Sequence, residues 1–62
     1  MKKYQVIEVE VDKQNKYQVI DNENWRWSEA TNARGAVLGA LACGVQLRDI
    51  NFNGHKVGYI KQ

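Results

Sequence analysis

The sequence has no proline, one cysteine and one histidine among its 62 residues. A single cysteine excludes an intramolecular disulfide. Cys43 and His55 alone are too few ligands for a zinc site. Disulfides and structural metals are the usual supports of a chain this short. We therefore expect a single domain over residues 1–62 that is stabilised by well-packed secondary structure or by assembly with another chain.

Long hydrophobic runs are also absent from the sequence. No stretch approaches the roughly 20 apolar residues of a membrane helix, and Glu8 and Glu10 interrupt the segment that could follow Met1-Lys2-Lys3 as a signal peptide. The composition, 44% apolar and 26% charged, is typical of a globular domain. We expect no membrane association, and the lone cysteine favours a cytoplasmic location.

No pattern of a catalytic or phosphate-binding site stands out. Cys43 lies among alanines and His55 beside a predicted turn, so a nucleophile and base pair is not expected. Gly35 and Gly39 are not followed by the Lys-Ser/Thr of a phosphate loop. We therefore expect no enzyme activity, no cofactor, no metal and no small-molecule substrate.

Residues 4–11 alternate between apolar and polar side chains, which predicts a half-buried strand. Residues 12–15 are polar and predict a turn, and residues 16–20 predict a second strand that completes a hairpin. Pairing Val11 with Tyr17 places Val9 opposite Val19. The apolar side chains of the first strand that we expect to face the core are Ile7, Val9 and Val11.

The C-terminal segment predicts a second hairpin. Asn53-Gly54 lies between two alternating runs, the strongest short signal for a two-residue hairpin turn. The predicted cross-strand pairs are Phe52 with His55, Ile50 with Val57, and Arg48 with Tyr59.

Between the hairpins, the apolar spacing predicts a helix over residues 28–43. Ser28 is a good N-cap, and Gly44 stands where a helix commonly ends. The predicted inward stripe consists of Ala30, Ala33, Val37 and Leu41. The expected fold is therefore α+β with the order ββαββ: two antiparallel β-hairpins form a four-stranded sheet, and one helix packs on one face. The strand order stays open.

The segment Trp25-Arg26-Trp27 is the first candidate interaction site. Tryptophan beside arginine is typical of protein-binding hot spots and of stacking on nucleic-acid bases. The alternative is structural, with one or both tryptophans covering the core beside the helix, which would leave Arg26 free to act.

The back of the predicted helix is the second candidate. It has no charge from Gly35 to Gly44, and each internal glycine costs about 1 kcal/mol relative to alanine. Such a surface lets another backbone approach closely. It is either an interface with another helix, or it is covered by the chain's own termini or by the tryptophan segment. The residues predicted on this back are Asn32, Gly35, Ala36, Gly39 and Cys43.

Two functions follow from these candidates. The favoured one is binding to another protein or to itself as a homodimer, through the helix back with Trp25 or Trp27 as the anchor. The size and build are similar to those of very short accessory proteins of phages and mobile elements, including inhibitors of host defence systems. The alternative is DNA or RNA binding by the more basic C-terminal half together with Trp25-Arg26-Trp27, although the net charge of only +2 is low for it. Its candidate residues are Arg26, Arg34, Arg48, Lys56 and Lys61.

Overall fold

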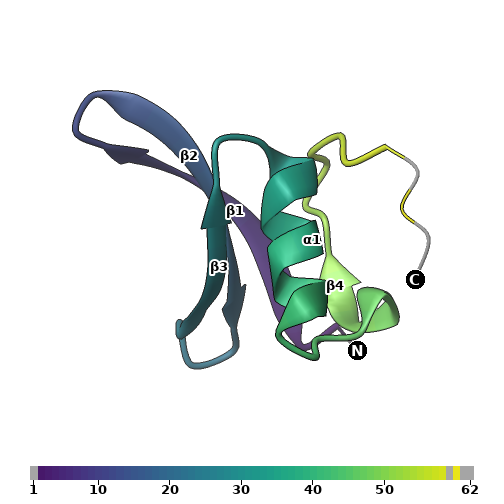
Figure 1. The fold of residues 1–62 in the computed structure, drawn as a ribbon. Helices are drawn as coiled ribbons and strands as arrows, with labels where there is room; N and C mark the ends of the chain where they lie inside the picture. The colour runs from purple at the N-terminus through teal and green to yellow at the C-terminus, as the bar shows by residue number, and fades with distance from the viewer. Residues whose placement is uncertain (1, 59, 61–62) are drawn as a thin grey trace.

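The computed structural model describes residues 2–58 and 60 and contains a four-stranded mixed sheet with one α-helix packed on it (Figure 1). The elements are β1 (Tyr4–Val11), β2 (Gln14–Asp21), β3 (Arg26–Ala30), α1 (Ala33–Ala42), the 3₁₀ helix η1 (Leu47–Asp49) and β4 (Ile50–Asn51). The strand order is β3-β2-β1-β4; β4 runs parallel to β1 and the other neighbours are antiparallel. The predicted α+β class is confirmed.

A two-residue turn joins β1 to β2. Asp12 and Lys13 both have left-handed backbone angles, with φ of 52° and 68°, as a type I′ turn requires. The pairing that follows from this turn sets Val11 opposite Gln14. The predicted hairpin is confirmed, but its predicted pairing of Val11 with Tyr17 is wrong because the turn uses two residues instead of the whole polar stretch.

This register determines which side chains of β1 reach the core. Val6 lies opposite Val19, and both are fully buried beneath α1. Side chains alternate along a strand, so the odd-numbered residues of β1 point to the other face of the sheet. The prediction that Ile7, Val9 and Val11 face the core is therefore wrong.

The helix begins later than predicted because residues 26–30 form β3. Asn32 is the N-cap, and its side chain accepts a hydrogen bond of 2.7 Å from the backbone N–H of Gly35. Ser28 lies in β3, where its hydroxyl donates to the carbonyl of Ala36 in the helix. The predicted end is confirmed, since Gly44 follows the C-cap with a φ of 97°.

The C-terminal turn forms, but its predicted hairpin does not. Asn53 and Gly54 are left-handed, with φ of 55° and 80°, and the N–H of His55 donates to the carbonyl of Phe52 over 3.0 Å. Residues 52–58 and 60 contain no strand, because the chain leaves the sheet after Asn51. The predicted Phe52–His55 and Ile50–Val57 strand pairs are therefore wrong. The pairing of Arg48 with Tyr59 lies outside the described residues.

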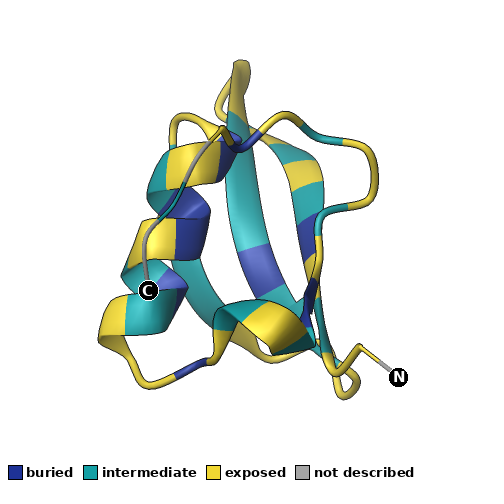
Figure 2. Ribbon diagram, turned by 90° about the vertical axis from the view of Figure 1, so that its right-hand side faces the viewer, coloured by how far each residue is buried: buried dark blue, intermediate teal, exposed yellow. Residues whose placement is uncertain are grey.

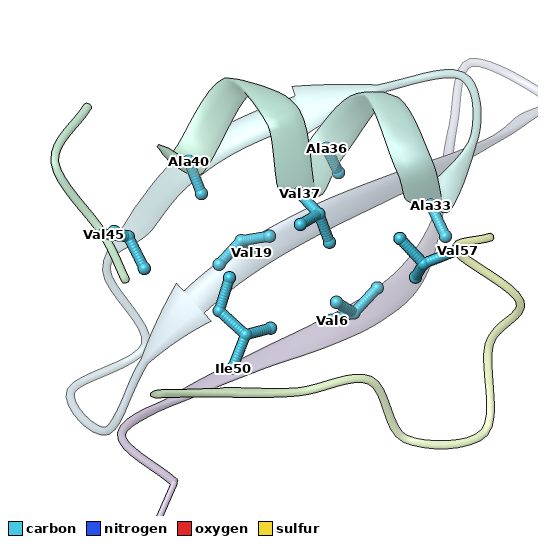
Figure 3. Close-up of a cluster of buried hydrophobic side chains, with 9 residues drawn as sticks. All are labelled: Val6, Val19, Ala33, Ala36, Val37, Ala40, Val45, Ile50 and Val57. Atoms are coloured by element: carbon cyan, nitrogen blue, oxygen red, sulfur yellow. The ribbon is translucent and has the colours of Figure 1, made fainter. Parts of the chain in front are cut away.

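The segment after β4 closes the core instead. The Nδ2 atom of Asn53 donates to the carbonyl of Val6 over 2.8 Å, which ties the turn to β1. The chain then returns toward α1 and buries Val57. The core lies between α1 and the sheet (Figures 2 and 3) and is built from small side chains: Val6, Val19, Ala33, Ala36, Val37, Ala40, Val45, Ile50 and Val57.

Candidate functional site

The face of the sheet opposite α1 is the main surface that the fold leaves without a packed layer; we call it the open face. In the described part of the chain, α1 and the segments after it lie on the other side of the sheet (Figure 1), and their core residues pack there. Cross-strand neighbours share a face, and the register therefore assigns these residues to the open face: Ile7, Val9, Val11, Lys16, Gln18, Ile20, Arg26 and Glu29.

The centre of the open face is apolar. Ile7, Val9 and Val11 follow one another along β1, and Ile20 contributes a fourth branched side chain from β2. All four are half-buried. Alternation in the sequence revealed this apolar stripe but did not show which side of the sheet would carry it. The stripe is available to a partner, because α1 packs against the opposite face.

A polar network borders this stripe around Glu29. Its Oε2 accepts a hydrogen bond of 2.7 Å from Gln18 Nε2 and lies 3.5 Å from Nη1 of Arg26, while Oε1 lies 3.8 Å from Nζ of Lys16. The hydrogen bond from Gln18 is the largest cause that lowers the pKa of Glu29, and the two cations lower it further. Glu29 lies in β3 and not in the helix, which the sequence predicts over residues 28–43.

Trp25 projects beside this network with 67% of its surface exposed. Together with Gln18, Asn24 and Arg26 it lines an open depression of about 270 Å³. A tryptophan so exposed in a chain this small is not needed by the core. Of the two candidate tryptophans, Trp25 is the exposed one.

Trp27 is structural. Its ring packs edge-on against Tyr4, with centroids 5.9 Å apart and planes at 87°, and it contacts the hydrophobic core. Its Nε1–H donates to Oδ2 of Asp21 over 3.1 Å. Trp27 is half-buried by these contacts, so it exposes less of its side chain to a partner than Trp25 does.

The carboxylate of Asp21 organises the turn that presents Trp25. Its Oδ1 accepts the backbone N–H groups of Glu23 and Trp25 at 2.8 and 3.0 Å. Hydrogen bonding, first from the backbone of Trp25 and then from Trp27, lowers the pKa of Asp21. Lys3, Tyr4 and this turn also border an open depression of about 520 Å³.

The predicted helix-back surface is not an exposed surface. Ala36 is fully buried, and Cβ atoms at Gly35 and Gly39 would lie 3.0 and 3.1 Å from the Cβ atoms of Ala30 and Ser28 in β3. The prediction is wrong because the tryptophan segment continues into β3 and covers this side of the helix, the alternative that the sequence left open. The two glycines let α1 approach β3 closely.

Two other residues of that predicted surface lie at the helix ends. Asn32 caps the N-terminus, and Cys43 is the exposed C-cap, with its Sγ 3.7 Å from the carbonyl of Trp27. The large apolar residue that α1 does expose is Leu38, at 42%.

The predicted nucleic-acid residues do not meet on one face. Arg26 lies on the open face, whereas Arg34 is in the first turn of α1 on the other side of the sheet. Arg48 lies in η1, beyond the opposite end of α1, and Lys56 follows the turn at residues 53–54. Lys61 lies outside the described residues.

Among the described residues, no group of three or more histidine, cysteine, aspartate or glutamate side chains is placed to hold a metal ion. None of the described helices has the length and hydropathy that crossing a membrane takes. Comparison of the chain with protein-family models, curated proteins and solved structures gives no match.

Proposed function

We propose that this protein is a small non-enzymatic binding module that docks on another protein through its open face. The observation that carries the proposal is the apolar stripe of Ile7, Val9 and Val11 on a sheet face without a packed layer. The exposed Trp25 lies across β2 from this stripe, where it borders the same depression as Gln18. An antiparallel sheet commonly keeps a polar outer face. A branched aliphatic stripe on that face is typical of a surface that a partner covers.

The border of the stripe supports a protein as the partner. Interfaces are enriched in tryptophan and arginine at their energetic centre and have polar groups around it. Trp25 and Arg26 are the tryptophan and arginine of this surface, and the hydrogen-bonded network around Glu29 provides its polar groups. Branched aliphatic side chains offer nucleic-acid bases no ring to stack on, so this face suits apolar protein side chains better.

The test has two parts. Light scattering of the purified chain over a range of concentrations measures its oligomeric state, and affinity capture from a lysate of cells whose genome encodes the chain identifies partner proteins. We expect either a defined dimer, in which a second copy is the protein docked on the open face, or one stoichiometric complex with a captured protein. Trp25→Ala should weaken it by about 2 kcal/mol or more, roughly thirtyfold, and Val9→Lys should weaken it as well because it places a charge in the stripe.

Leu38→Lys is the matched control, since Leu38 is exposed but lies on α1, away from the open face. It should leave the complex unchanged. A monomer that captures no protein, or a complex that Leu38→Lys disrupts while Trp25→Ala does not, would overturn the proposal. Action on a host defence system stays a prediction, which the identity of the captured protein would check.

A further inference from the structure

Beyond Val6, the outer edge of β1 is not paired within the described part of the chain. β4 pairs with β1 only at Tyr4 and Gln5. The carbonyl of Val6 accepts a hydrogen bond from the side chain of Asn53. From there the β1–β2 hairpin extends past α1 as an arm (Figure 1). The rest of β1 is thus an edge strand, with no strand paired to its outer side among the described residues.

The register identifies the backbone groups at this edge. The two-residue turn makes Val11 and Gln14 a hydrogen-bonded pair, so the odd-numbered residues of β1 bond to β2. The even-numbered residues direct their N–H and C=O groups outward, as Val6 does toward Asn53. Along the arm, Glu8 and Glu10 therefore offer two N–H and two C=O groups to an added strand.

The side chains along the edge define what such a strand would carry. The carboxylates of Glu8 and Glu10 are exposed on one face, and neither forms an ion pair among the described residues. The apolar stripe of Ile7, Val9 and Val11 lies on the other face. Residues opposite each other on neighbouring strands share a face, so a complementary strand alternates cationic and apolar side chains.

We propose that the outer edge of β1 from Glu8 to Val11 binds an extended segment of a partner protein in which lysine or arginine alternates with branched apolar residues. This proposal rests on the proposed protein-binding function and names the chemistry of the partner. The segment extends the sheet by one strand, as in other cases of β-strand addition. Its cations lie beside Glu8 and Glu10, and its apolar side chains widen the stripe on the open face.

A second copy of the chain does not satisfy this edge. Two β1 strands pairing antiparallel along it would bring Glu8 of one copy beside Glu10 of the other. Like charges directly opposite on neighbouring strands are destabilising. The same charges that repel a second copy attract a basic strand, and this charge complementarity selects the occupant.

The experiment is an NMR titration of the ¹⁵N-labelled full chain with the blocked heptapeptide Lys-Val-Lys-Val-Lys-Val-Lys. We expect the largest shifts, and slowed hydrogen exchange, at the amides of Glu8 and Glu10. The heptapeptide Glu-Val-Glu-Val-Glu-Val-Glu should not bind. Glu8→Gln and Glu10→Gln should each weaken binding about two- to fivefold. Glu23→Gln, in an exposed loop, should have no effect.

N-methylated peptides separate strand addition from simple charge attraction. One peptide is methylated on its lysines and another on its valines, so that only one of the two loses the N–H groups that face β1. Binding lost with one peptide and kept with the other supports the proposal. Binding kept by both or lost by both overturns it, as does the absence of binding by the unmethylated peptide.

The outcome is distinguishable from failure of the proposed function. If the chain captures a protein that Trp25→Ala releases, yet the edge binds no peptide, only the strand addition is overturned. If the peptide binds but Trp25→Ala and Val9→Lys leave the captured complex intact, strand addition at the β1 edge is supported and docking through the open face is overturned.

Discussion

Trp27 donates a hydrogen bond from Nε1 to Oδ2 of Asp21 over 3.1 Å, and this bond joins the end of β2 to the beginning of β3. The other oxygen of the same carboxylate accepts the backbone N–H of Trp25. Asp21 therefore links the structural tryptophan to the exposed one. The position of Trp25 at the border of the open face depends on this link.

Asp21→Ala should loosen the turn without unfolding the chain. It removes an acceptor from two backbone N–H groups and from the indole of Trp27, while the core contacts of Trp27 remain. We expect a lower denaturation midpoint and faster hydrogen exchange at the amides of Glu23 and Trp25. Asn22→Ala in the same loop is the control. Unchanged exchange in Asp21→Ala would show that the carboxylate does not organise the turn.

Stability should fall in acid because of two carboxylates. The pKa values of Asp21 and Glu29 lie below their ordinary values of 3.8 and 4.5 in the folded chain. The unfolded chain therefore binds these protons first as the pH falls. The two carboxylates contribute fully to the free energy of unfolding at a pH above their ordinary pKa values. This contribution is lost as the pH falls through their pKa values in the folded chain.

Urea denaturation at pH 7 and at pH 3 measures this loss. Asp21→Asn and Glu29→Gln should each narrow the difference between the urea midpoints at pH 7 and at pH 3. The reason is that the amide side chain introduced by each substitution does not titrate. Glu23→Gln is the control, since the wild-type pH dependence should persist in it. A difference that neither Asp21→Asn nor Glu29→Gln narrows would assign the acid sensitivity to other groups.

Element types were predictable where short-range signals agree. The polar stretch after Val11 and the Asn53-Gly54 pair both mark real turns, and Gly44 ends the helix. The α+β class followed from these signals. Tertiary pairing was not predictable at the C-terminus, because Asn51 ends a strand whose partner is β1, far away in the sequence.

The candidate site was only partly predictable, and the reason lies in the register. Four polar residues follow Val11, and the sequence does not tell which two form the turn. Shifting the pairing by an odd number exchanges the two faces. Alternation thus marks Ile7 and Val9 as apolar, but it does not show that they lie on the face opposite α1. Trp25 is a candidate from the sequence alone, because tryptophan next to arginine needs no register to be recognised.

Gly39→Arg should destabilise the fold, because a side chain there would meet β3. Its Cβ would lie 3.1 Å from the Cβ of Ser28, and overpacking of this kind costs about 1–3 kcal/mol. The better helix propensity of arginine offsets about 1 kcal/mol of this cost. Urea denaturation should therefore show a net loss of up to about 2 kcal/mol. Leu38→Arg, on the exposed side of α1, should stay within about 0.5 kcal/mol of wild type.

Lys13→Gly should stabilise the chain, because Lys13 has a φ of 68° in the turn between β1 and β2. A left-handed conformation costs a residue with a Cβ about 1–2 kcal/mol, and glycine avoids this cost but loses more chain entropy on folding. We expect a net gain of about 0.5–1 kcal/mol in urea denaturation. Lys13→Ala removes the same charge but keeps a Cβ, so it should give no gain. Equal stabilities of the glycine and alanine variants would contradict the two-residue turn, and with it the register that places Ile7, Val9 and Val11 on the open face.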